Sequence, residues 1–254
     1  MKHLKKSACK VILILGMLMS LPGWGADMIL IPAGSFRMPA LLDKTVHKVS
    51  AFYIDRNPVT NAEYLEFVKT HPEWRKSKVK KIFSDNNYLE YWQDDLNFGE
   101  ASMASSPVVR ISWYAARAYC DSLGKRLASI DEWEYVGLVP YKDKKDLKSV
   151  ILEWYGKSAE WPLPAVRSGA SNNDGVYDMH GLIWEWVEDF NSSMVTGESR
   201  ADVALDRNLF CGGGAASAAD PADYAAFMRY AFRSSLQAKY TVRNLGFRCV
   251  KNKE

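Results

Sequence analysis

Clusters of apolar positions predict short strands at both ends of the chain. A strand is predicted over residues 28–36, where apolar residues 28–31 are followed by a turn at Gly34 and then by Phe36. A second strand is predicted over residues 49–55. Later strand-like pieces lie at residues 183–187, 209–211, 230–233 and 246–250. Each piece is short, so regular secondary structure is expected to be sparse.

Capping residues predict three helices before most of these later pieces. In a capping box, a hydroxyl and a carboxylate three residues apart each satisfy a free backbone N–H. Two such pairs occur, Thr60 with Glu63 ahead of Tyr64, Phe67 and Val68, and Ser129 with Glu132 ahead of Trp133 and Val136. Between them, Ser112 caps a predicted helix that ends at Gly124. Early helices and late small strands predict an α+β fold.

The N-terminus has the layout of a secretory signal peptide. Four lysines, at positions 2, 5, 6 and 10, precede the apolar residues 11–21, and no acid occurs before Asp27. This run of about eleven residues is shorter than the roughly 20 that a membrane-spanning helix needs, so no stable membrane anchor is expected. Small residues place the cut after Gly25 or Ala26. We expect residues 1–26 to be a signal peptide and residues 27–254 to be one periplasmic or secreted domain.

Charge and cysteine content narrow the functional classes. The whole chain has 33 basic and 30 acidic side chains, and removal of the four lysines leaves a net charge of −1. Neither nucleic acid nor an anionic membrane is therefore an expected partner. Cys120, Cys211 and Cys249 remain after export. An oxidising compartment favours pairing two of them, which leaves one free thiol.

One carboxylate stands out among the aromatic residues. Glu185 lies between Trp184 and Trp186, and a strand places both indoles on one face. A carboxylate in such surroundings needs a cation, backbone N–H donors or solvent.

Six segments in order carry a family resemblance: residues 57–64, 107–113, 119–127, 131–135, 175–186 and 244–249. With these segments the sequence resembles the formylglycine-generating enzyme (sulfatase-modifying factor) family. The resemblance implies the irregular α+β variant of the C-type lectin fold. It also implies a disulfide between Cys120 and Cys249, which leaves Cys211 as the free thiol.

The resemblance implies a structural calcium site as well. In the family, the corresponding loop supplies backbone carbonyls and a glutamate, which here are His180, Gly181, Ile183 and Glu185. Oxygen ligands suit this hard cation. Leu182 replaces the usual asparagine, and the alternative is a Glu185 that accepts only backbone hydrogen bonds.

The catalytic centre departs from the family pattern. Members of the family oxidise a substrate cysteine with a copper ion held by two cysteines, and neither is present here. Ser217 or Asp220 falls near the first position and Ala225 near the second. Cu(I) prefers thiolates, so the standard conversion of cysteine to formylglycine is not expected, and copper binding stays open.

This altered segment is most similar to accessory proteins encoded beside copper nitrite reductases. The shared residues are Phe210, Cys211, Gly212, Asp220, Tyr224, Met228 and Arg229. The similarity implies maturation or support of an exported redox enzyme, such as a copper nitrite reductase. The candidate catalytic residues are Cys211, Ser217, Asp220 and Arg229, and the candidate ligand-binding residues are Trp113, Trp186, Tyr224 and Arg233.

Alternatives remain at two levels. Cys211 is a soft-metal ligand near Met228, a redox-active thiol activated by Arg229 or Arg233, or a buried small hydrophobe. The whole protein is an accessory factor, a metal-dependent oxidoreductase with altered chemistry, or a lectin-fold module that binds a peptide or small ligand without turnover. Three scattered histidines, at positions 47, 71 and 180, argue against the second reading.

Overall fold

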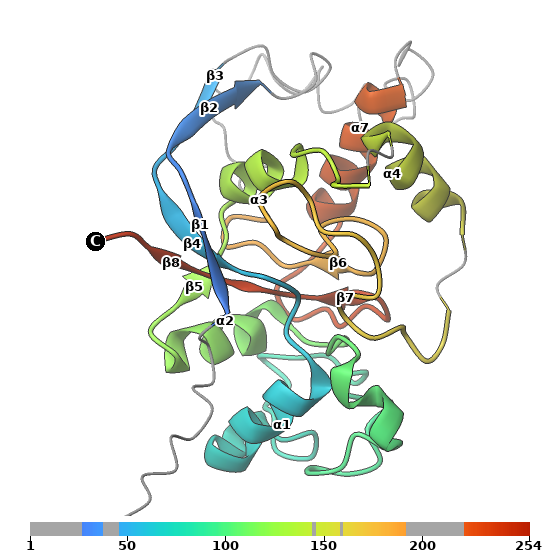
Figure 1. Cartoon of the computed structure of the whole chain (residues 1–254). Coiled ribbons are helices and arrows are strands. Elements are labelled where there is room, and N and C mark those ends of the chain that lie inside the picture. Colours follow the sequence, from blue (N-terminus) through green and yellow to red (C-terminus); the bar gives the residue numbers. More distant parts are fainter. Residues whose placement is uncertain (1–26, 38–45, 144–145, 158–159, 192–220) are drawn as a thin grey trace, which may run out of the picture.

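A computed structural model describes residues 27–37, 46–143, 146–157, 160–191 and 221–254. Its main sheet has four antiparallel strands in the order β1-β4-β8-β5. They are β1 (Met28–Ile31), β4 (Phe52–Asp55), β8 (Cys249–Asn252) and β5 (Arg126–Leu127). The strand nearest the C-terminus therefore lies inside the sheet, between two strands from earlier in the chain (Figure 1).

Two small sheets accompany the main one. Strands β2 (Gly34–Arg37) and β3 (Val46–Val49) pair antiparallel, and β6 (Trp184–Glu185) pairs parallel with β7 (Leu245–Gly246). The strand predicted over residues 28–36 is thus two strands. The one predicted over residues 49–55 begins at Phe52, because Val49 ends β3, which turns away to pair with β2. Only two residues of the predicted strand 183–187 pair with a neighbour.

The three capped helices are confirmed as α1 (Asn61–Thr70), α2 (Trp113–Ser122) and α3 (Ile130–Gly137). Both capping boxes form, and the Ser112 side chain accepts a hydrogen bond from the Ala115 N–H. Helix α2 ends just before Gly124, whose φ of +64° is one that glycine adopts readily. Short 3-10 helices η1 (Pro72–Trp74) and η2 (Ala101–Ser105) follow α1.

Two further helices correct the sequence prediction. Helix α4 (Leu147–Gly156) was not predicted; it is capped by Asp146, whose side chain accepts a hydrogen bond from the Ser149 N–H. Residues 230–233 were predicted as a strand, but they belong to α7 (Pro221–Ser234). Proline suits the first helical position, and the alanines, methionine and arginines that follow favour a helix. The separation into early helices and late strands was therefore wrong, although the fold does mix helices with a small sheet.

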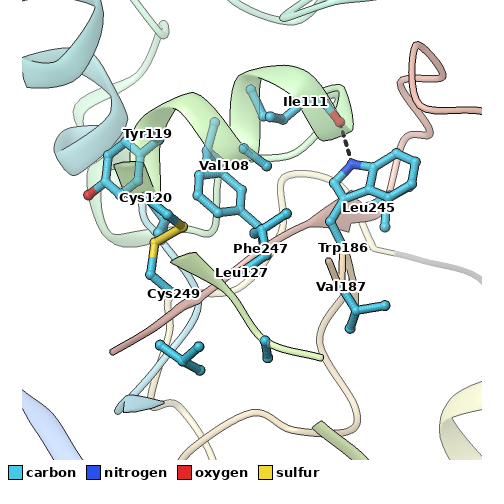
Figure 2. Close-up of a cluster of buried hydrophobic side chains, with 14 of the residues drawn as sticks. Val108, Ile111, Tyr119, Cys120, Leu127, Trp186, Val187, Leu245, Phe247 and Cys249 are labelled. Atoms are coloured by element: carbon cyan, nitrogen blue, oxygen red, sulfur yellow. Dashed lines mark hydrogen bonds between the residues drawn. A yellow bond between two sulfur atoms is a disulfide. The ribbon is translucent and has the colours of Figure 1, made fainter. Parts of the chain in front are cut away.

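The main hydrophobic core joins the sheet to α1, α2 and α3 and to residues 176–190. In Figure 1, α1 and α2 lie below the line of β8 and β7, whereas α3, α4 and α7 lie above it. The predicted disulfide joins Cys120 of α2 to Cys249 of β8 and lies beside Phe247 (Figure 2). No helix among the described residues is both long and apolar enough to span a bilayer.

Candidate functional site

Glu185 is neutralised by an arginine from the last of the six family segments. Arg248 donates from Nη2 to Glu185 Oε1 at 2.7 Å and from Nε to Oε2 at 2.8 Å. The Trp133 indole N–H donates to Oε2 at 2.9 Å. Both charged side chains are almost completely buried, at 1% and 0% exposed. Of the three alternatives left open for Glu185, which were a cation, backbone N–H donors or solvent, the structure shows a cation, Arg248.

A second buried carboxylate, Glu134 of α3, holds two arginines of α7. Arg229 donates from Nη2 to Glu134 Oε2 at 2.8 Å, and Arg233 donates from Nη1 to Oε1 at 2.7 Å. Burial alone would raise the pKa of Glu134, but the two guanidinium groups lower it to about 2. The arginines predicted to be catalytic and ligand-binding thus lie in an ion-pair cluster that fixes α7 to α3.

Trp133 contacts both of these carboxylate–arginine groups and a buried histidine. The Arg233 guanidinium lies 4.9 Å from the centre of the Trp133 ring, and the His180 ring meets it edge to face at 5.3 Å. Sequence reasoning did not single out Trp133 or Glu134. The signal was present, because residues 130, 133, 134 and 137 fall on one helix face, which places a carboxylate within an apolar stripe.

His180 is neutral in the folded protein. Its Nε2 lies 2.9 Å from the Gly137 carbonyl, which can only accept, so Nε2 carries the proton. Nδ1 is then a bare acceptor, and it has no hydrogen-bond partner among the described residues. Burial, reinforced by the positive charge of Arg229, lowers the pKa of His180 to about 3.

The two tryptophans predicted to bind ligand use their indole N–H groups inside the fold. Trp186 is 1% exposed and donates to the Ile111 carbonyl at 2.7 Å (Figure 2). Trp113 donates to the Val187 carbonyl at 3.0 Å. Both rings contact Phe190, with centroids 6.1 Å from Trp113 and 5.1 Å from Trp186. The structure thus brings these two predicted residues together as packing partners.

The remaining predicted site residues lie outside the described part of the chain. Cys211, Ser217 and Asp220 fall in residues 192–220, and the Tyr224 side chain is likewise not described. Ala225, predicted near the second copper-ligand position, is 2% exposed on α7. The predicted catalytic centre therefore stays a prediction.

The described residues do not favour the calcium site that the resemblance implies. Both oxygens of Glu185 already accept from cationic or indole donors, so its carboxylate has no oxygen left for calcium. Copper binding stays open, because the candidate ligands Cys211, Ser217 and Asp220 lie outside the described residues. Within the described residues, no three His, Cys, Asp or Glu side chains lie close enough to hold a metal ion.

An aromatic hollow opens between α4, α7 and β6. It measures about 300 Å³ and is lined by Trp154, Tyr155, Lys157, Glu160, Leu163, Pro164, Gly181, Leu182, Trp184, Met228 and Asn244. The Trp184 ring lies between the rings of Tyr155 and Phe232, at centroid distances of 5.2 and 4.4 Å. The volume of the hollow lies at the lower end of the range for small-ligand sites, and its lining combines aromatic and aliphatic side chains with Lys157, Glu160 and Asn244. Sequence reasoning missed it because α4, which supplies one wall, was not predicted.

Comparisons with known proteins agree with the resemblance. A formylglycine-generating enzyme of Mycobacterium tuberculosis is 25% identical and aligns with 88% of this chain and 97% of its own length. The inactive C-alpha-formylglycine-generating enzyme 2 of Bos taurus is 27% identical, over 65% of this chain and 71% of that protein.

Other relatives share only part of their length or only the fold. The serine/threonine-protein kinase pkn1 of Chlamydia pneumoniae is 27% identical over 65% of this chain, which spans only 28% of the kinase. The structure of PvdO from Pseudomonas aeruginosa has a TM-score of 0.53 at 19% identity, over 89% of this chain and 94% of that one. CarF has a TM-score of 0.53 at 15% identity, over 91% and 100%. The family model of the sulfatase-modifying factor enzyme 1-like domain matches residues 22–253. With nearly its whole length matched, the chain belongs to the sulfatase-modifying factor family.

Proposed function

We propose that this protein is an exported member of the family that does not use the copper-dependent reaction and instead assists an exported redox enzyme. The cysteine inventory carries the proposal. Of four cysteines, Cys120 and Cys249 are bonded to each other, and Cys9 lies in the predicted signal peptide. Cys211 is then the single thiol of the exported chain, and one thiol cannot supply the pair of thiolates that Cu(I) requires.

Similarity to relatives supports the family but does not decide the reaction. The matches include both a formylglycine-generating enzyme and a protein named as an inactive one. We infer from the altered cysteine pattern that this chain resembles the inactive kind. Its short elements and small sheets also support the finer fold proposal, the irregular C-type lectin fold.

A turnover assay tests the loss of the standard reaction. The exported protein is incubated with Cu(I), oxygen and a sulfatase peptide that contains the target cysteine, and the peptide mass is followed. The formylglycine-generating enzyme of Mycobacterium tuberculosis serves as the positive control. We expect no aldehyde product from this protein, and copper-dependent conversion of the peptide would overturn the proposal.

Thiol counting tests export and the disulfide together. The protein purified from the periplasm is expected to begin at Ala26 or Asp27 and to show one free thiol when denatured without reductant, and three after reduction. Cys211→Ala should remove the free thiol. An uncleaved N-terminus, or cytoplasmic protein with all thiols free, would contradict export.

Partner function is tested through the metal content of the assisted enzyme. A copper nitrite reductase is produced in the periplasm with and without this protein, and its copper content and nitrite turnover are measured. Reduced copper or turnover in the absence of this protein is the expected result. A fully loaded and active reductase in its absence would remove that enzyme as the partner.

The aromatic hollow favours a second candidate, a binding module without turnover. A small ligand or peptide that binds there, with Trp154→Ala weakening the binding and no product formed, would support this candidate over the accessory role.

A further inference from the structure

A second hollow lies beside the aromatic one and contains a buried carboxylate. It measures about 210 Å³ and is lined by Tyr141, Asp143, Val150, Pro164, Ser168, Gly169, Ala170, Asp178, His180, Gly181 and Leu182. We call it the Asp178 hollow. It shares Pro164, Gly181 and Leu182 with the aromatic hollow, so the two are neighbours on one surface.

The Asp178 side chain is largely buried and makes no ion pair among the described residues, although the positive charges of Arg248 and Arg167 lie near enough to attract it. The residue is 7% exposed, and its Oδ2 accepts one hydrogen bond, from the Arg167 backbone N–H at 2.7 Å. Among the described residues, no ion pair or second hydrogen bond involves this carboxylate. The nearby Arg248 gives its hydrogen bonds to Glu185 and to the carbonyls of Asp55 and Tyr177. One hydrogen bond and these more distant charges are all that offset the burial of the carboxylate, so a cationic group in the hollow would gain from pairing with it.

The backbone around Asp178 is also in an unusual conformation. Asp178 has a φ of +57° and Arg167, its hydrogen-bond partner, has a φ of +63°. Left-handed backbone at residues other than glycine is uncommon and concentrates at ligand sites. Aspartate and asparagine tolerate it best among residues with a side chain. The fold therefore holds this carboxylate in place at an energetic cost.

The walls indicate what kind of cation fits. Val150, Pro164, Ala170 and Leu182 present aliphatic surface, and Tyr141 adds an aromatic ring. A bare metal ion prefers several oxygen or nitrogen ligands, and the described residues bring no three metal-binding side chains together. An alkyl chain that ends in a cationic nitrogen suits both the apolar walls and the carboxylate, because its methylenes contact the walls while its N–H groups reach Asp178.

We infer that the Asp178 hollow binds an alkylammonium or alkylguanidinium group, with Asp178 as its counter-ion. The group is carried either by a small amine or by a lysine or arginine side chain of another polypeptide. This site does not involve Cys211 or copper, so it stands independently of the accessory role.

A binding titration tests the inference. The probes are n-butylammonium, acetyl-lysine methylamide and acetyl-arginine methylamide, with n-butanol as the neutral control, each added to the mature protein and followed by NMR or calorimetry. Saturable binding of at least one cation, at least tenfold tighter than butanol, is expected. Binding of butylammonium alone identifies a free amine as the source, whereas binding of a capped amino acid identifies a side chain.

Two variants and one control locate the binding. Asp178→Asn keeps an acceptor for Arg167 and tolerates the left-handed backbone, and it should weaken binding about tenfold or more. Ala170→Leu should fill the hollow and weaken binding while Asp178 is intact. The control Asp174→Asn, at an exposed acid four residues earlier, should leave binding unchanged.

The thermal unfolding midpoint of each variant verifies folding. No saturable binding of any cationic probe would overturn the inference. Equal binding by Asp178→Asn, or binding of calcium in place of the amines, would also overturn it.

Discussion

Arg248, which directly precedes β8, forms a buried ion pair with Glu185 of β6, with Nη2 and Oε1 2.7 Å apart. Arg248 also donates from Nη1 to the Asp55 carbonyl and from Nη2 to the Tyr177 carbonyl. One guanidinium therefore fastens three segments of the chain around one carboxylate. Replacing a whole buried ion pair by apolar residues often leaves stability unchanged or raises it. Removing only one partner, in contrast, leaves an uncompensated buried charge and is strongly destabilising.

Glu185→Gln is expected to destabilise the protein by about 3–5 kcal/mol, because Arg248 loses its counter-charge within the core. The free energy of unfolding from urea titration measures the effect. The matched control is Glu153→Gln, which breaks the exposed pair with Lys157 and should change stability by less than about 1 kcal/mol. Equal effects of the two variants would contradict the assigned role.

Calcium is tested through the same carboxylate. Because Arg248 and Trp133 occupy both oxygens of Glu185, adding calcium or a chelator should leave the unfolding midpoint unchanged. Differential scanning calorimetry of the mature protein in both conditions decides the matter. A midpoint that rises with calcium and does so less in Glu185→Gln would show that the ion displaces these donors.

His180 makes stability depend on pH in the mildly acidic range. Its pKa is about 3 in the folded protein and 6.5 in the unfolded chain, so the unfolded chain binds more protons between these values. Stability contributed by the neutral ring is complete above pH 6.5 and is lost as the pH falls toward 3, by up to about 1.4 kcal/mol per pH unit. His180→Gln should flatten this part of the profile. His71→Gln, at the partly exposed end of α1, is the control and should follow the wild-type slope.

Glu134 acts in a more acidic window. Its pKa falls from 4.5 to about 2 on folding, so its contribution is present above pH 4.5 and is lost as the pH falls toward 2. Glu134→Gln should cost about 3–5 kcal/mol at pH 7, because two buried guanidinium groups lose their shared partner. The difference from wild type should narrow between pH 4.5 and 2. A constant difference across that range would rule out the assigned ionisation.

Gly246 is predicted to tolerate no side chain. A Cβ there would lie 2.4 Å from the Val108 carbonyl oxygen and 2.8 Å from Ile183 Cδ1. Gly246→Ala should therefore destabilise the protein by about 1–3 kcal/mol or more, as overpacked cores do. Gly156→Ala is the matched control, since a Cβ at the end of α4 meets nothing within 4 Å, and it should stabilise by about 0.4–1 kcal/mol. Urea unfolding of both variants compares the two effects.

Local chemistry made the early helices predictable. A capping box is read from two residues three positions apart, and Thr60 with Glu63 and Ser129 with Glu132 both form it. The disulfide between Cys120 and Cys249 was implied by the resemblance and is confirmed. In each case the decisive information lies in a short segment or in the family pattern.

Partners distant in sequence were not predictable in the same way. The surroundings of Glu185 left a cation as one of three alternatives, and nothing local identifies Arg248, which lies 63 residues away. Glu134 and its arginines on α7 are 95 and 99 residues apart, and the residues that carry Arg233 were predicted as a strand. The two hollows are built by loops and by α4, whose packing the periodicity of a single segment does not reveal.

The position of β8 sets the order in which the molecule can assemble. Ile54 pairs with Val250, so the centre of the sheet joins residues almost two hundred positions apart. Contacts of such long range require a large loss of chain entropy before they are rewarded, which slows folding. The helices depend mainly on local contacts and can form early, whereas the main sheet is complete only after β8 has paired with β4 and β5. We expect β8 to gain protection from hydrogen exchange, and Cys249 of the reduced chain to gain protection from alkylation, last during refolding.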